Sequence, residues 1–297
     1  MKQTVTFLLD RGIGHKEQYI TAPHTSFRIG GVADLAIFPR KREELIETIA
    51  FLRAQKMPFE VIGNASNVLF AFDRFEGALV FTEHMDRVEQ RDHELICDCG
   101  VSLTALSAHA AELGLSGLEF AYGIPGTVGG AVFMNAGAYG SCVSEVLTKS
   151  LAYDCVSGRA TALHEHEFGY RSSLYMKQPS LICLEATFSL TPDDREQIRA
   201  RMRTNMESRR EKQPLSFPSA GSYFKRPEGH FAGKLIEDAG LKGARVGGAQ
   251  ISEKHAGFLI NCGGATASDV LALEEMVRQT VWERFGVRLE REVRVIR

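Results

Sequence analysis

The chain has 297 residues, of which 44% are apolar and 24% charged, and its net charge is −2 at pH 7. This length allows a sizeable core and either two domains or one large domain with an insertion. The charge excludes the strongly basic footprint of a nucleic-acid-binding protein. No apolar run approaches the roughly 20 residues that span a bilayer.

Two further observations concern the compartment. The N-terminal apolar run Phe7-Leu8-Leu9 is too short for a signal peptide. The six cysteines are scattered, and the close pair Cys97-Asp98-Cys99 has no second Cys/His pair at zinc-site spacing. A metal or redox role for that pair stays open, but we expect reduced thiols, no metal and a cytoplasmic protein.

In the first third of the chain, strand-like and helix-like patterns alternate. Residues 26–38 alternate between apolar and polar, and Arg28 lies there beside two glycines. Apolar residues at helical spacing predict a helix over 41–56. A short strand over 59–62 then leads into Gly63-Asn64-Ala65-Ser66-Asn67. Such a loop suits a phosphate or ribityl group, although the same residue types make any tight turn.

A helix is predicted over 102–113, and the most distinctive stretch follows it: Gly117–Gly140, GLEFAYGIPGTVGGAVFMNAGAYG. It contains seven glycines and almost no charge, and its apolar residues make it unlike a flexible linker. Glycine permits positive φ and a close approach of the backbone to a ligand. Two interpretations stay open: a buried loop whose amides face the phosphates of a cofactor, or tight turns in a β-rich domain.

Three polar residues in the second half of the chain are candidate functional residues. Arg171 is flanked by Tyr170 and followed by two serines, so it suits either a bound carboxylate or phosphate or a surface stack on the tyrosine. Gly221 allows a turn that projects Ser222 into a cleft, but no serine-hydrolase elbow surrounds this serine. Glu292 lies in a terminal strand over 287–296, where the default interpretation is a salt-bridged surface charge.

The remaining patterns indicate an α+β fold. A basic helix runs to about residue 211 and is followed by Pro214 and Pro218, which indicate a domain boundary. Thr266 and Asp269 predict a capped helix over 266–285. The chain has neither a strand-linked GxGxxG motif nor a GKS/GKT loop. Any dinucleotide must therefore be held in another way.

Several segments carry a family resemblance when they are taken together and in order. They are Thr25–Gly31, Gly63–Leu69, Gly123–Gly140, Tyr170–Ser173, Ala220–Lys225, Leu241–Ala249 and Leu289–Arg294. In this order they resemble the UDP-N-acetylenolpyruvoylglucosamine reductase (MurB) family, over nearly the whole chain from about residue 20. In its compact length the chain resembles members of the shorter type II subgroup, which lack an inserted substrate-covering loop.

The resemblance implies an α+β fold with an FAD-binding region of the vanillyl-alcohol-oxidase (PCMH) type and a substrate-binding domain. Residues 1–79, completed by the C-terminal strand 286–297, would form one FAD-binding subdomain and residues 80–191 the second. Residues 205–285 would bind the UDP-sugar. The implied enzyme binds FAD and reduces UDP-N-acetylglucosamine enolpyruvate with NADPH, giving UDP-N-acetylmuramate for peptidoglycan. We expect a monomer without a nucleic-acid or membrane partner.

The resemblance also implies residue roles. Hydride passes from NADPH through flavin N5 to the enolpyruvyl carbon, and an enolate-like intermediate follows. Arg171 and Glu292 would polarise the substrate carboxylate, and Ser222 would protonate the carbon. The implied FAD-binding residues are Arg28, Gly63, Asn64, Ala65, Ser66, Asn67, Gly123, Ile124, Pro125, Gly126, Gly129 and Gly130. The implied substrate-binding residues are Tyr122, Asn135, Lys212, Lys225 and Lys242, with Lys212 or Lys225 also placed to stabilise a serine alkoxide.

Two residues depart from the family pattern. Ala65 places a β-carbon where the family loop has glycine, and Arg226 replaces an asparagine. These departures bear on the FAD and substrate contacts respectively. Two alternative functions stay open: a flavin oxidase or dehydrogenase with another substrate, and a non-catalytic UDP-sugar or nucleotide binding protein. The presence of Arg171, Ser222 and Glu292 argues against the second alternative.

Overall fold

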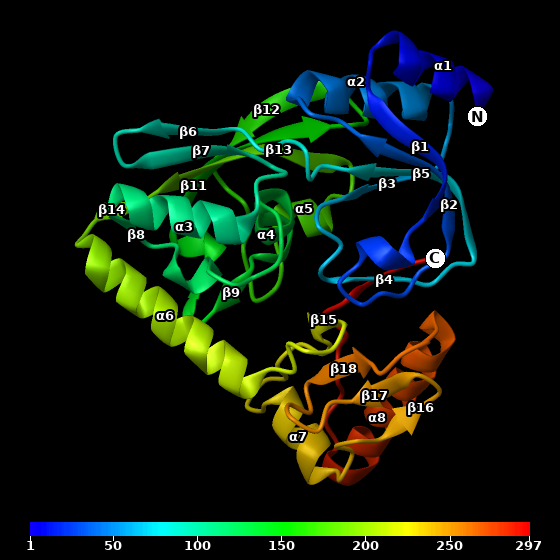
Figure 1. Ribbon diagram of the computed structural model, residues 1–297, viewed down its shortest axis with the longest axis vertical. Coiled ribbons are helices and arrows are strands. Elements are labelled where there is room, and N and C mark those ends of the chain that lie inside the picture. The colour runs from blue at the N-terminus through cyan, green and yellow to red at the C-terminus, as the bar shows by residue number, and fades with distance from the viewer. The chain divides into compact units, whose positions relative to one another are not determined.

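The computed structural model describes all 297 residues, and the chain divides into two compact units (Figure 1). The first unit comprises residues 1–18, 34–64 and 76–207, and the second comprises 19–33, 65–75 and 208–297. Each unit encloses its own apolar core. The last segment of the second unit begins close to the predicted boundary at residue 205. The division of the FAD-binding region into two subdomains stays a prediction.

The first unit is built on sheets with helices packed against them (Figure 1). One sheet has the order β1–β2–β5–β3 and another the order β12–β11–β13–β7–β6, while β8 pairs with β14 and β9 with β10. The strands are β1 (Gly14–Ile20), β2 (Val32–Phe38), β3 (Phe59–Ile62), β5 (Arg74–Phe81), β6 (Val88–Arg91), β7 (Glu94–Asp98), β8 (Leu115–Ser116), β9 (Gly137–Ala138), β10 (Ser141–Cys142), β11 (Leu147–Asp154), β12 (Arg159–Leu163), β13 (Leu181–Ser189) and β14 (Thr191–Pro192). The helices are α1 (Lys2–Asp10), α2 (Arg42–Ala54), α3 (Leu103–Leu113), α4 (Val128–Met134), α5 (Leu174–Lys177) and α6 (Arg195–Lys212), with 3₁₀ turns η2 (Glu119–Ala121) and η3 (Val143–Glu145).

Local capping chemistry explains two helices of this unit. The Ser102 side chain accepts a hydrogen bond from the Ala105 amide, and Gly114 ends α3 in the left-handed region at φ 73°, as the sequence predicts. In α4 the Thr127 side chain accepts from Gly130, and Asn135 ends the helix at φ 43°. The prediction of loop or turns throughout Gly117–Gly140 is therefore wrong for 128–134, because the Thr127 side chain caps one end of a short helix there and the left-handed backbone of Asn135 ends the other.

The second unit contains a sheet of order β15–β18–β17–β16, and β19 pairs in parallel with β4. Its elements are η1 (Ala22–His24), β4 (Val68–Phe70), β15 (Ser219–Ser222), α7 (Ala232–Asp238), β16 (Arg245–Val246), β17 (Ala249–Ile251), β18 (Phe258–Asn261), α8 (Ala267–Phe285) and β19 (Arg294–Ile296). The predicted capping box at Thr266 and Asp269 is present. The predicted strand over 287–296 is shorter than expected, since only β19 and an isolated Phe224–Arg291 bridge are paired.

Of the apolar stripe that the spacing predicts on α8, Val270, Leu273, Val277 and Val281 are fully buried in this core, whereas Phe285, its last member, is exposed. None of the helices in either unit combines the length and the apolar composition required to cross a membrane.

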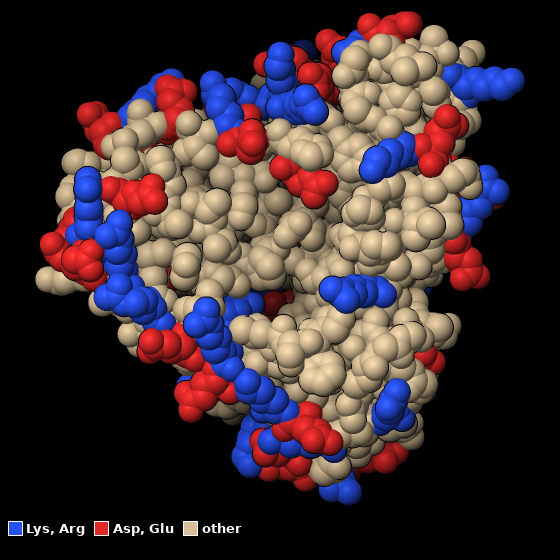
Figure 2. All heavy atoms as spheres, viewed as in Figure 1, with Lys and Arg blue, Asp and Glu red and all other residues tan.

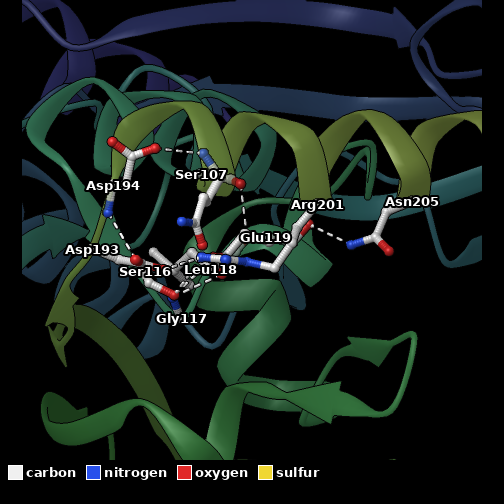
Figure 3. Close-up of polar contacts among 10 residues, drawn as sticks. Ser107, Ser116, Gly117, Leu118, Glu119, Asp193, Asp194, Arg201 and Asn205 are labelled. Atoms are coloured by element: carbon white, nitrogen blue, oxygen red, sulfur yellow. Dashed lines mark hydrogen bonds and ion pairs between the residues drawn. The ribbon is translucent and has the colours of Figure 1, made fainter.

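Arg201 attaches α6 to the start of the glycine-rich stretch and to the residue just before it (Figure 3). Its guanidinium donates to Glu119 Oε1 at 2.7 Å, to Asp193 Oδ2 at 2.5 Å and to Ser116 Oγ at 3.2 Å. Burial opposes the charge of Glu119, but hydrogen bonds from Arg201 and the Gly117 amide together lower the pKa of this carboxyl. Most other Lys and Arg side chains of α6 form an exposed row mixed with acidic residues (Figure 2).

We predict that Arg201→Ala lowers the free energy of unfolding by about 1 kcal/mol, because Glu119 is largely buried and loses its cation. Arg199→Ala is the matched control, since Arg199 lies on the same helix and pairs only with the exposed Glu196. Chemical denaturation of both variants measures the difference. Equal effects of the two substitutions would contradict the role given to Arg201.

Candidate active site

In the first unit, the two predicted cofactor loops lie against each other. Asn64 Nδ2 donates to the Pro125 carbonyl at 2.8 Å. A β-carbon added to Gly63 would collide with the hydroxyl of Thr127, the residue that caps α4. Only glycine permits this approach. The tertiary structure therefore joins two segments that the sequence separates by about sixty residues into one surface with few side chains.

The amides of this surface are partly used by the protein itself. Gly129 donates to the Cys99 carbonyl at 2.7 Å and Gly130 donates to Thr127 Oγ1 at 3.3 Å. A β-carbon on Gly129 would lie 2.9 Å from that of Cys99. Gly129 is thus needed for the close packing of α4 against the end of β7, and its amide has a partner within the protein.

In the second unit, the remainder of the 63–67 loop is connected to Glu292. Asn67 Nδ2 donates to the Glu292 carbonyl at 3.1 Å, and the Arg294 amide donates to the Asn67 carbonyl at 3.0 Å. Ala65 is buried and has φ 43°, in the left-handed region that favours glycine. The alanine that departs from the family pattern therefore lies in a backbone conformation that glycine adopts more readily.

Arg28 is exposed at φ 54° and lines an open pocket of about 440 Å³ with Ala22 and Pro23. The backbone around it is held by Asn261, whose side-chain amide donates to the Phe27 carbonyl at 3.1 Å and the Arg28 carbonyl at 3.4 Å. Asn261 is not among the residues predicted from the sequence. Its signal was an asparagine at the end of an apolar strand, a position where a buried amide needs several partners.

The segments that contain Ser222 and Glu292 are joined by a backbone hydrogen bond in the second unit. The Glu292 amide donates to the carbonyl of Tyr223, the residue after Ser222, at 2.8 Å. Gly221 has φ 80° and lies at a register irregularity between Ser219 and Ser222, so the chain turns there as predicted. Ser222 is exposed at the end of β15, and Glu292 is half-buried.

Arg171 belongs to the first unit, in a loop that follows β12. Its guanidinium donates to the Gly137 carbonyl at 2.7 Å and the Asn135 carbonyl at 3.3 Å, and it also lies 5.2 Å from the ring centroid of Tyr170. The Asn135 side chain donates to the Gly169 carbonyl at 3.0 Å and accepts from the Ser144 amide at 3.0 Å. Asn135 therefore holds the Arg171 loop against the end of α4.

A buried polar group supports the start of the same loop. Ser150 Oγ lies 2.8 Å from His166 Nε2 and 2.7 Å from Tyr175 Oη. Burial, assisted by repulsion from His164, lowers the pKa of His166, and burial raises the pKa of Tyr175. Both side chains therefore stay neutral at pH 7, and they join the Arg171 loop to β11 of the central sheet.

The other predicted substrate residues are scattered over the two units. In the second unit, Lys225 Nζ lies 3.6 Å from Glu290, Lys242 donates to Glu237 at 2.7 Å, and Lys212 is exposed at the end of α6. Tyr122 in the first unit packs against a small apolar cluster with Ile198 and Met202.

Arg226, the second departure from the family pattern, lies in the second unit and stacks over the exposed Phe231 ring at 4.5 Å from its centroid.

Comparison with known proteins assigns the family. Residues 213–296 match the family described as UDP-N-acetylenolpyruvoylglucosamine reductase, C-terminal domain, and residues 33–160 match the FAD binding domain family. A UDP-N-acetylenolpyruvoylglucosamine reductase of Geobacillus kaustophilus is 46% identical over 92% of this chain and 90% of its own length. One of Caldicellulosiruptor bescii is 44% identical over 98% of this chain and 93% of its own.

The chain belongs to the UDP-N-acetylenolpyruvoylglucosamine reductase family. The crystal structure of a family member from Thermus caldophilus has a TM-score of 0.79 and 32% identity, covering 96% of this chain and 99% of that one. The predicted family, the α+β fold with a PCMH-type region, the FAD-dependent reductase class and the FAD requirement are thereby confirmed. The individual site residues stay predictions.

We predict that Gly63→Ala weakens FAD retention in this reductase at least tenfold. The added methyl group must displace Thr127 and with it the cap of α4, a small-to-large change that typically costs about 1–3 kcal/mol. FAD released on gel filtration measures the loss. Gly14→Ala is the control, because its β-carbon would make only ordinary contacts at 3.6 Å. Full retention in Gly63→Ala would contradict the packing argument.

We predict that Ala65→Gly raises the free energy of unfolding by about 1 kcal/mol. Left-handed backbone costs an L-residue about 1–2 kcal/mol, part of which is offset by the greater freedom of glycine in the unfolded chain. Thermal melting of the apo and FAD-loaded forms measures the gain. Ala71→Gly, in a segment without positive φ, should instead destabilise. A lower melting temperature for Ala65→Gly would refute the prediction.

Proposed function

We propose that this chain uses bound FAD to reduce UDP-N-acetylglucosamine enolpyruvate to UDP-N-acetylmuramate, with NADPH as the reductant. The observation that carries the proposal is the backbone bond from Glu292 to Tyr223, which holds the segment of Glu292 beside the residue that follows Ser222. The names of the relatives support the substrate. The NADPH preference, the cytoplasmic location, the monomeric state and the three-part domain division rest on the family resemblance.

The residues present fit FAD. The Gly63–Thr127 contact leaves a surface where a single β-carbon would collide, and Asn64 is fixed there by its bond to Pro125. Gly63, Asn64 and the 123–126 loop would hold the cofactor in the first unit, and Arg28 and residues 65–67 would do so in the second. When bound, FAD accepts a hydride from NADPH and supplies it to the enolpyruvyl carbon.

Three side chains of this chain would act on the substrate. Arg171 supplies a permanent positive charge beside the substrate carboxylate, and two backbone carbonyls orient its planar guanidinium. Glu292 would contact the same carboxylate group as a hydrogen-bond donor, which requires a proton on one of the two acids. Together they favour the negative charge that develops beside the carboxylate when hydride is added.

Ser222 would then transfer its hydroxyl proton to the adjacent carbon. A serine hydroxyl is a weak acid, so this step requires a strongly basic carbon and close positioning. Its exposed position at the end of β15 allows contact with a substrate. Lys225, three residues later and next to the Glu290 segment, is the candidate cation for the resulting alkoxide.

For Ser222→Ala we predict normal reduction of the flavin by NADPH and reoxidation by the enolpyruvyl substrate at least 100-fold slower, the scale of a lost general acid. Anaerobic stopped-flow measurement of flavin absorbance separates the two half-reactions.

Ser216→Ala, at an exposed serine in the preceding turn, is the control. Colourless protein that takes up no FAD would overturn the function itself. Rapid reoxidation by oxygen with no response to the enolpyruvyl substrate would indicate a flavin oxidase with another substrate. Undiminished turnover of Ser222→Ala would remove the role given to this serine.

A further inference from the structure

The residues next to Ser222 and Glu292 contact a buried carboxylate that the proposed chemistry does not use. Glu274 on α8 has a side chain that is only 3% exposed. Its Oε2 atom accepts hydrogen bonds from Tyr223 Oη and from Arg291 Nε, each at 2.8 Å. Tyr223 follows Ser222 in sequence and Arg291 precedes Glu292. One buried oxygen therefore receives a donor from the immediate neighbour of each proposed catalytic residue in this unit.

Backbone contacts hold the segment around Tyr223 directly beside the segment around Arg291. The Glu292 amide donates to the Tyr223 carbonyl, Phe224 and Arg291 form an antiparallel bridge, and the Lys225 amide donates to the Glu290 carbonyl at 2.8 Å. In extended segments, neighbouring side chains lie on opposite faces. Accordingly Tyr223 is buried in the core of the unit while Ser222 is exposed. A shift of either inward side chain must move the outward one beside it.

The charges explain why Glu274 holds one position. Burial and the adjacent Glu274 carboxylate raise the pKa of Tyr223, so the phenol keeps its proton and donates. Glu274 Oε1 is buried without a hydrogen bond, and its nearest cation is Arg278 Nη1 at 3.6 Å. A buried carboxylate needs its partners, and a set of directed bonds specifies a single arrangement where apolar packing permits several.

We propose that Glu274 is a positioning residue that sets the relative placement of Ser222 and Glu292 through Tyr223 and Arg291. This inference rests on the proposed function, because it assigns Ser222 and Glu292 to the substrate. Glu274 itself contacts neither substrate nor cofactor. Its effect is confined to the step in which the substrate is reduced and protonated, since flavin reduction by NADPH requires neither residue.

The test compares Tyr223→Phe, Glu274→Gln and Glu274→Ala with the wild-type holoenzyme in the two half-reactions. Tyr223→Phe removes one hydroxyl, and Glu274→Gln keeps the shape and one acceptor oxygen. We expect flavin reoxidation by the enolpyruvyl substrate to slow about 5- to 10-fold in both, and further in Glu274→Ala. Flavin reduction by NADPH should stay within twofold. The dissociation constant of UDP-N-acetylmuramate, measured by calorimetry without turnover, should change less than threefold.

The control is Glu275→Gln, the next residue of α8, which is exposed and should change no rate. The double variant Ser222→Ala with Glu274→Gln completes a double-mutant cycle. Its reoxidation rate should fall by less than the product of the two single decreases, because the two residues act in one step. Equal slowing of both half-reactions, or a lower melting temperature with unchanged reoxidation, would reduce Glu274 to a structural residue and overturn the inference.

The outcomes separate this inference from the proposed function. If Ser222→Ala slows reoxidation and neither Tyr223→Phe nor Glu274→Gln does, only the positioning role fails. If wild-type flavin is not reoxidised by the enolpyruvyl substrate, the proposed function fails. Should Glu274→Ala not fold, the two conservative variants still decide the question.

Discussion

The backbone hydrogen bond from Glu292 to Tyr223 is the contact on which the arrangement of the predicted site residues within the second unit depends. The C-terminal segment 289–296 is bonded on one side to the Ser222–Lys225 segment and on the other to Asn67 and β4. It is paired as a regular strand only over its last residues. Three parts of the chain that are far apart in sequence are thus held together by a few main-chain bonds, and side chains such as Glu274 must keep their geometry.

Several predicted site residues have a strained backbone. Nine residues other than glycine have positive φ, and Arg28, Ala65, Asn135 and Arg171 are among them. Each such conformation costs of order 1 kcal/mol and persists only where neighbouring contacts enforce it. Those contacts are visible here: Asn261 holds the Arg28 backbone, and Asn135 holds the Arg171 loop. Stability elsewhere in each unit maintains a site that is locally unfavourable.

Much of this fold was predictable because its signals are local. Apolar spacing and caps located α2, α3 and α8, since helix ends depend on residues within one turn. Helix α4 was missed because seven glycines suggested loop, while the deciding residues were the caps Thr127 and Asn135. Glu274 was missed although it adjoins Leu273 on the apolar stripe. A charge at the edge of such a stripe signals a buried ion pair, but Tyr223 and Arg291, which donate hydrogen bonds to it, lie in other segments.

The sequence by itself determined the family, the reductase chemistry it implies and the glycine positions of the cofactor loops, because ordered motifs and residue types can be read without coordinates. The tertiary structure decided which of those residues meet. It placed Gly63 against Thr127, joined Asn67 to Glu292, and directed Tyr223 and Arg291 to one carboxylate oxygen. These contacts join residues far apart in the chain, and such pairings depend on the packing of whole elements rather than on local propensity.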